Sequence, residues 1–275
     1  MNLTQKEITF TLAEGPRRTG RGKCNSLTRS LSRRTRAAFT LAEVLITLGI
    51  IGVVAAMTIP TLMANIKGMQ YRNQFKKTIS TVSNAARMSL ARYDFDFAGV
   101  DKYAYEQSDE ERAKANPETE KSMSAIFNGT LAGASYLGYV DMLGGDGYSS
   151  VGGPKFNGFS SVGPDREAAA YQLADGSIVG FMYAVGNCAL APGEDFSNIS
   201  LCYGFIDVNG FSLPNKEIKC SDNKPTRSSF WGSGGTYEDC IVKNSDITDI
   251  FPIIFHDTTV EPASNAAKYV LNTTK

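Results

Sequence analysis

The feature that most constrains this 275-residue chain is an apolar stretch from Phe39 to Met63, FTLAEVLITLGIIGVVAAMTIPTLM. These 25 residues contain a single charged side chain, Glu43. A helix of roughly 20 residues crosses the hydrocarbon of a bilayer, whereas the apolar core of a secretory signal has only about 7–15 residues. The stretch therefore predicts a membrane-spanning helix.

The charge distribution indicates the orientation of this helix. Residues 1–38 carry nine Lys and Arg against two Glu, about +7, and the whole chain is neutral, so the remainder carries about −7. The basic flank at Arg33, Arg34 and Arg36 should stay in the cytoplasm. We therefore expect a single pass through the inner (cytoplasmic) membrane, with the N-terminus in the cytoplasm and a periplasmic or extracellular head. The acidic exported part has no basic cluster that would favour nucleic-acid binding.

Glu43 needs an explanation, because a carboxylate inside a spanning segment costs at least ~2.5 kcal/mol. It belongs to the sequence Ala-Phe-Thr-Leu-Ala-Glu-Val-Leu at residues 38–45, which is followed by the apolar run. This sequence resembles the N-terminal cleavage and methylation motif of type IV pilins and type II secretion pseudopilins. In that family a membrane aspartyl peptidase cuts before the Phe and methylates the new N-terminus. The resemblance implies cleavage between Ala38, where the family prefers Gly, and Phe39, which becomes N-methylated.

The same resemblance implies how the apolar helix is used. The Glu43 carboxylate would pair with the Phe39 amine of an adjacent subunit. Pro60 matches a proline that the family often carries, and it should kink or loosen the helix because it removes a backbone hydrogen bond. The implied partners are other pilin or pseudopilin subunits, the prepilin peptidase/methyltransferase, the inner-membrane assembly platform and the lipid bilayer.

Residues 64–93 predict an amphipathic helix that continues into the exported part. Phe75, Ile79, Val82, Ala86 and Leu90 recur at spacings of three and four, with polar residues between them. The residues alone indicate two adjoining helices. The resemblance implies that they form one continuous spine.

The exported head, residues 94–275, shows strand and turn signals. Asp175-Gly176 lies between two β-like runs and predicts a hairpin, and Asn209-Gly210 ends another strand signal. The run 250–255 contains Pro252 and therefore predicts an edge strand. Glycines in residues 143–164 predict a loop. We expect an α+β, pilin-like fold, in which a small antiparallel sheet packs on a long helix.

Four cysteines in the exported part predict two disulfides, since the count is even and the compartment is oxidising. Three pairings are possible, and we favour Cys188–Cys202 and Cys220–Cys240 because both close local loops. Zinc is disfavoured because no pair has close ligand spacing.

A second pattern comprises Asp207-Val-Asn209-Gly210, a later Pro-Asn, and Asp246 and Asp249 before Ile-Phe. It resembles a pattern in the C-terminal regions of many pseudopilin-like proteins, some of which bind calcium there. Asp207, Asn209, Asp246 and Asp249 are therefore candidate calcium ligands. The alternative is that these residues only shape turns. We expect no other cofactor.

The sequence favours a structural subunit and not an enzyme, because it has one histidine and no nucleophile–base spacing. We expect a cleaved leader at 1–38, a transmembrane assembly helix at 39–63, an amphipathic helix at 64–93 and a head at 94–275. The alternatives are a signal-anchored surface adhesin or binding protein, and a secreted protein cut near Ala56.

Overall fold

The computed structural model describes residues 39–141, 167–182, 186–190, 202–212, 214–221 and 240–273. The leader and the glycine-rich loop predicted at 143–164 lie outside these residues. The chain divides into two compact units, residues 1–49 and 50–275, and each is described by itself.

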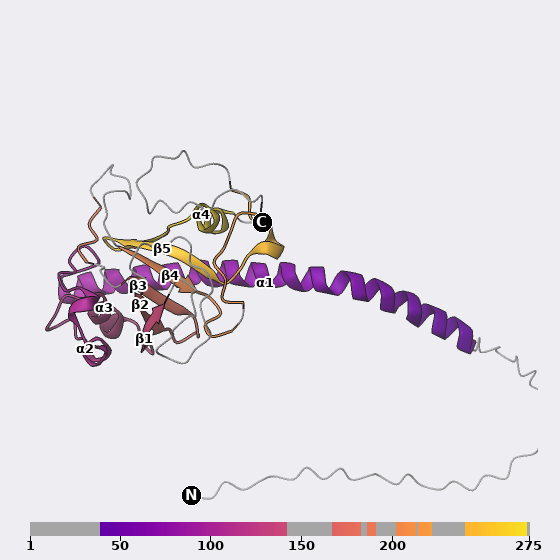
Figure 1. Ribbon diagram of the computed structural model, residues 1–275, viewed down its shortest axis with the longest axis horizontal. Helices are drawn as coiled ribbons and strands as arrows, with labels where there is room; N and C mark the ends of the chain where they lie inside the picture. The colour runs from indigo at the N-terminus through magenta and orange to yellow at the C-terminus, as the bar shows by residue number, and fades with distance from the viewer. Residues whose placement is uncertain are drawn as a thin grey trace, which may run out of the picture. The chain divides into compact units, whose positions relative to one another are not determined.

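The described helices and strands form an α+β fold, as predicted (Figure 1). In chain order they are α1 (Leu41–Tyr93), η1 (Ala104–Glu106), α2 (Asp109–Lys114), α3 (Met123–Thr130), β1 (Ser135–Asp141), β2 (Glu167–Gln172), β3 (Ile178–Met182), β4 (Tyr203–Asp207), η3 (Asn244–Asp246), β5 (Ile250–His256), β6 (Thr259–Pro262) and α4 (Asn265–Asn272).

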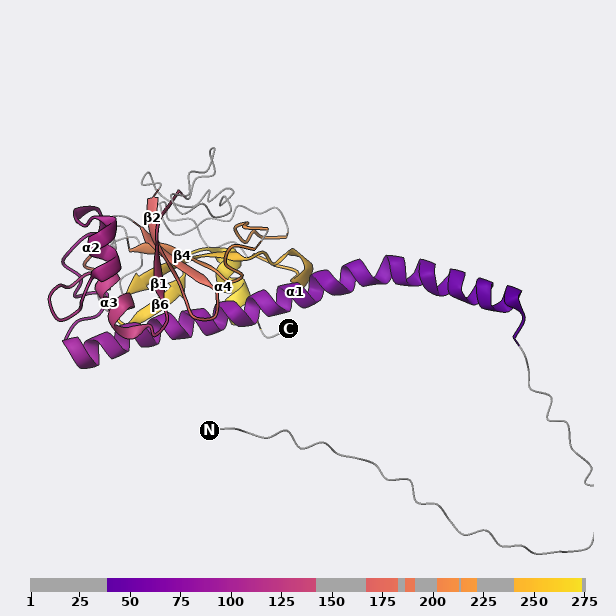
Figure 2. The ribbon, with the colours of Figure 1, turned by 90° about the horizontal axis from the view of Figure 1, so that it is seen from below.

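Helix α1 is continuous over 53 residues, so the two adjoining helices indicated by the sequence are one element. Pro60 lies inside it without ending it. The second half of α1 lies along the sheet (Figures 1 and 2). Its side chains Phe75, Val82 and Ala86 are fully buried, as the predicted apolar stripe requires.

The last turn of α1 differs from that stripe. Leu90 is 43% exposed, whereas Ser89 is fully buried. Ser89 lies seven residues after the buried Val82, so it continues the same side of the helix, whereas Leu90 lies about 100° further around the axis. The apolar pattern pointed to Leu90 because the residue on the buried side is a serine.

The six strands form one antiparallel sheet in which the spatial order β1-β2-β3-β4-β5-β6 repeats the chain order. The hairpin predicted around Asp175-Gly176 is confirmed. Gln172 pairs with Ile178 across it, and Gly176 has φ of 87°, a left-handed conformation that glycine adopts without a Cβ penalty.

Helices α1 and α3 pack on one face of this sheet. Strand register and the alternation of side chains place Val179, Ile206 and Phe251 on the same face. The Phe75 ring of α1 stacks on Phe251 with ring centroids 4.0 Å apart. Further along the sheet, Phe127 of α3 meets the Phe181 ring edge-on at 5.5 Å. These aromatic contacts join the helices to the core.

The prediction of an edge strand at 250–255 is wrong, because β5 lies between β4 and β6. Pro252 is opposite Phe205 of β4, and its carbonyl accepts from the Ala263 amide on the other side. In a strand the amide and carbonyl of one residue point to the same neighbour. The N–H that Pro252 lacks would therefore point to the position after Pro262. Because β6 has already ended there, the sheet tolerates the proline.

Candidate functional site

The start of α1 carries the acid that the sequence singled out. Thr40 precedes the helix, and its amide and hydroxyl donate to Glu43 Oε2, both at 2.8 Å. The Glu43 amide donates back to Thr40 Oγ1 at 3.2 Å. This reciprocal pair is a capping box, in which a Thr and a Glu three residues later satisfy each other's backbone donors at a helix start.

The capping role of Glu43 was missed in the sequence reasoning, which considered only a partner from another subunit. The signal was present, because Thr40-Leu-Ala-Glu43 has the Thr-x-x-Glu spacing of a capping box. Of the other predicted residues here, Ala38 lies outside the described part, and Phe39 precedes the helix with 82% of its surface exposed.

The apolar side chains of the first half of α1 have few contacts within the described chain. Leu45, Ile51 and Met57 are 60%, 63% and 74% exposed. The most apolar 18-residue window of α1 has a mean hydropathy of 2.2 and none of it is buried. By length and composition this helix can cross a membrane, and water is an unfavourable surrounding for so much apolar surface.

The second predicted cluster is centred on two buried carboxyl groups. Asp207 at the end of β4 and Asp249 just before β5 are both fully buried. Asp249 accepts the amides of Asn215 at 2.7 Å and Lys216 at 2.8 Å, one on each oxygen. Asp207 Oδ1 accepts the Asn209 amide at 3.1 Å, while Oδ2 accepts no hydrogen bond from the described residues.

Burial sets the protonation of this pair. Loss of hydration and the nearby Asp249 charge raise the pKa of Asp207 to about 8. Burial also raises the pKa of Asp249, against the backbone amides that favour its charged form. Asn209 donates to the hydroxyl of Tyr71, which connects the cluster to α1.

The structure brings together only some of the four candidate calcium ligands. Asp207, Asn209 and Asp249 come together, but Asp246 lies in η3, where it accepts from Ser245 Oγ at 2.8 Å. Among the described residues, no three His, Cys, Asp or Glu side chains gather as metal ligands. Calcium takes six to eight oxygens, and both Asp249 oxygens already accept amides, so the described residues do not fit calcium.

The cysteines lie at disulfide distance in the two favoured pairs. Cys188–Cys202 has Cα atoms 5.6 Å apart, and Cys220–Cys240 has Cα atoms 5.5 Å apart. The second pair joins residues 214–221 to residues 240–246, where the Lys243 amide also donates to Ser221 Oγ. This junction lies against α1, since Arg72 donates to Asn244 Oδ1 at 2.9 Å.

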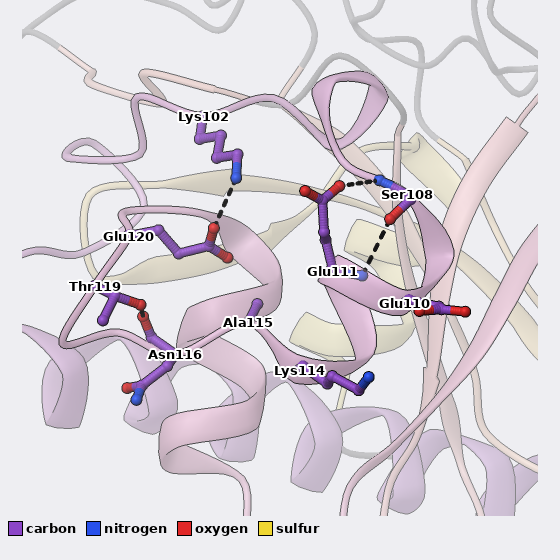
Figure 3. Close-up of a pocket in the computed structure, with 9 residues that line it drawn as sticks. All are labelled: Lys102, Ser108, Glu110, Glu111, Lys114, Ala115, Asn116, Thr119 and Glu120. Carbon is purple, nitrogen blue, oxygen red and sulfur yellow. Dashed lines mark hydrogen bonds and ion pairs between the residues drawn. The ribbon is translucent and has the colours of Figure 1, made fainter.

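A pocket of about 470 Å³ lies beside α2 (Figure 3). Its charged groups are largely engaged: Lys102 pairs with Glu120 at 2.8 Å, and Glu111 accepts the Ser108 amide in the capping box of α2. The lining contains no histidine or cysteine, so it offers no conventional nucleophile–base pair. Its residues are Lys102, Ser108, Glu110, Glu111, Lys114, Ala115, Asn116, Thr119 and Glu120.

Comparison with known proteins bears on the first of these sites. Residues 33–59 match the family model described as the prokaryotic N-terminal methylation motif. No curated protein and no solved structure matches the chain. The match covers the capping box and most of the exposed apolar run of α1. The chain thus carries, at its first helix, the signature motif of type IV pilins and pseudopilins.

Proposed function

We propose that this protein is a prepilin-like structural subunit, a pilin or pseudopilin, of a filament of the type IV pilus or type II secretion type. A prepilin peptidase/methyltransferase cuts between Ala38 and Phe39 and methylates Phe39. The mature chain is held in the inner membrane by residues 39–63, with residues 64–93 and the head 94–275 on the far side. An assembly platform then transfers it from the lipid into the filament.

The observation that carries the proposal is the exposed apolar first half of α1, with one acid at its start and within the matched motif. Such a surface needs lipid or other apolar helices around it. A filament provides these helices from neighbouring subunits. In a head-to-tail assembly each subunit uses different surfaces toward its two neighbours, so growth does not close.

Glu43 supplies the specificity of this packing. Cleavage creates a positively charged amine on Phe39, which would enter the apolar bundle without a counter-charge. The Glu43 carboxylate of an adjacent subunit neutralises it. Removing one partner of a buried ion pair costs about 3–5 kcal/mol, or more than about 100-fold in an assembly equilibrium.

The capping box makes it possible to test the charge of Glu43 separately from its role in capping the start of α1. Glu43→Gln keeps the side-chain acceptor for Thr40 but removes the charge, since Gln also serves at this position of the box. Thr40→Ala removes the cap but keeps the charge. Glu43→Leu removes both. We expect Glu43→Gln and Glu43→Leu to be inserted and cleaved but to remain in the inner membrane, and Thr40→Ala to assemble with a smaller loss.

The assay is the mature N-terminus by mass spectrometry, together with the fraction of the chain in sheared filaments. An uncut leader in cells with an active prepilin peptidase would remove the proposal. Filament incorporation of Glu43→Gln equal to wild type, with failure of Thr40→Ala, would assign the acid to capping alone. Cleaved chain that never leaves the membrane would favour the alternative of an anchored adhesin.

A further inference from the structure

The charges of the chain are segregated between α1 and the rest of the exported part. From residue 41 to 93 the sequence has six basic residues and one acid, Glu43, whereas residues 94–275 have 13 basic and 25 acidic residues. The exposed charges of the described residues are also segregated in space, independently of this division along the chain. Opposite charges gather at two places that are far apart along α1.

A lysine-rich surface surrounds the middle of α1. The segment 240–246 crosses the helix so closely at Gly68 that an added Cβ would lie 1.8 Å from the Asn244 carbonyl oxygen. The disulfide Cys220–Cys240 holds residues 214–221 beside this segment. The lysine end, as we name it, exposes Lys67, Lys216, Lys219 and Lys243, with Asp246 as the exposed acid among the described residues there.

The lysine end also exposes apolar side chains. Met69 of α1 is 44% exposed and Ile241 is 52% exposed. Exposed apolar groups with a charged surround are typical of surfaces that bind another protein. This mixture distinguishes the lysine end from an ordinary solvated surface.

An acid-rich surface lies at the other end of the same helix. Helices α2 and α3 lie beside the C-terminal end of α1 (Figures 1 and 2). An added Cβ at Gly129 of α3 would lie 3.5 Å from the Tyr93 ring. The described residues 101–121 form the acidic end, which exposes two lysines, Lys114 and Lys121, and six acids: Asp101, Glu106, Asp109, Glu110, Glu111 and Glu118.

The two ends are too far apart to pair within one chain. Gly68 and Tyr93 are 25 residues apart on one helix, which corresponds to ~37 Å at about 1.5 Å per residue. The Debye length is about 10 Å at 0.1 M salt, so the ends barely interact across this distance. A surface with opposite charges at its two ends is complementary to a translated copy of itself.

We propose that the lysine end of one copy of this chain docks on the acidic end of a second copy, head to tail along the direction of α1. The proposal rests on the filament function proposed above and names the contact between heads. Complementary charge at this contact sets the order and register of approach, while the apolar helices supply most of the burial. Met69 and Ile241 lie within the contact.

The first test is zero-length cross-linking with a carbodiimide on the full-length chain in its own membranes. The reagent joins a lysine and a carboxylate only where they touch, so peptides linking Lys219 or Lys243 to Glu110 or Glu118 must come from two copies. The link between Lys102 and Glu120, an ion pair of 2.8 Å within one chain, is the internal control. Control links without any inter-copy links would overturn the proposal.

The second test is charge reversal, read as the fraction of mature chain in sheared filaments. We expect the double variant Lys219→Glu, Lys243→Glu to lower this fraction about tenfold, since each exposed pair contributes a few-fold and repulsion adds to the loss. The double variant Glu110→Lys, Glu118→Lys should do the same. Combining all four changes in one chain should restore assembly.

A matched control makes the same change in net charge as the lysine-end double variant, but makes it at the acidic end. The double variant Lys114→Glu, Lys121→Glu makes the acidic end more acidic and should assemble as wild type does. Failure of this control, or failure of the combined variant to restore assembly, would overturn the pairing. Inter-copy links in membranes without any sheared filaments would support the contact while removing the proposed filament function.

Discussion

The buried carboxyl of Asp207 makes the stability of the head depend on pH in a direction opposite to that of most acids. Its pKa is raised to about 8 by burial and by Asp249, against about 3.9 in an unfolded chain. Below about pH 4 both states hold the proton. Between about pH 4 and pH 8 only the folded state holds it, so the contribution of Asp207 to stability falls over this range and is lost above about pH 8.

The size of this effect follows from the difference between the two pKa values. While the folded chain holds one proton more than the unfolded chain, each pH unit lowers the free energy of unfolding by about 1.4 kcal/mol. Between about pH 4 and pH 8 the sum reaches at most about 5 kcal/mol, a large part of the stability of an ordinary domain. The replacement Asp207→Asn has no proton to lose and should abolish this slope.

The assay is urea unfolding of the full-length chain in detergent micelles, followed by near-ultraviolet circular dichroism of the core aromatic residues from about pH 5 to pH 9. The stability of Asp207→Asn relative to wild type should rise from about pH 5 to pH 8 and level off above about pH 8. Asp249→Asn is the matched control. It gives up an oxygen that accepts a backbone amide, so it should lose about 1–3 kcal/mol. Parallel curves for wild type and Asp207→Asn would refute the reasoning.

Three further predictions concern packing, the disulfides and processing. Gly68→Ala places a Cβ 1.8 Å from the Asn244 carbonyl oxygen and should lower the free energy of unfolding by about 1–2 kcal/mol in the same assay. Gly52→Ala should not, because its Cβ meets no atom within 4 Å apart from the adjoining backbone of its own helix. Reduction of the two disulfides, which close 14- and 20-residue separations, should cost about 3 kcal/mol each and lower the melting temperature, while alkylation without reductant should label none of these cysteines. Ala38→Lys should block cleavage, and Ala38→Gly should speed it, both measured as the ratio of uncut to mature chain on immunoblots.

The predictions that succeeded rest on local rules. The apolar run, the stripe through Phe75 and Val82 and the turn at Asp175-Gly176 each follow from a pattern that acts over a few residues. Pro252 misled the sequence analysis because its tolerance depends on where a different strand, β6, stops. Asp246 was grouped with Asp207 and Asn209 through a resemblance to a family pattern, although the path of the chain between distant segments decides which side chains meet.

Some features of the site had a sequence signal that was given another meaning. Glu43 was read only as a charge in an apolar helix, although its spacing from Thr40 also predicts a cap. The buried Arg112 is a case without any such signal. It donates to the Ala104 and Gln107 carbonyls and to the Tyr136 hydroxyl, and a charge run around α2 gives no indication that one of its members is 2% exposed.

The sheet order has a consequence for how the head would fold under the export proposed above. Each strand pairs with the one that precedes it in the chain, so under the proposed export a partner would already be across the membrane when the next strand emerges. The β2–β3 and β5–β6 hairpins close short loops and should form quickly. The Phe75–Phe251 stack joins the first helix to the fifth strand, and so it forms only once most of the chain is present. Until β5 is present, the apolar stripe of α1 that this strand covers in the folded head lacks that cover.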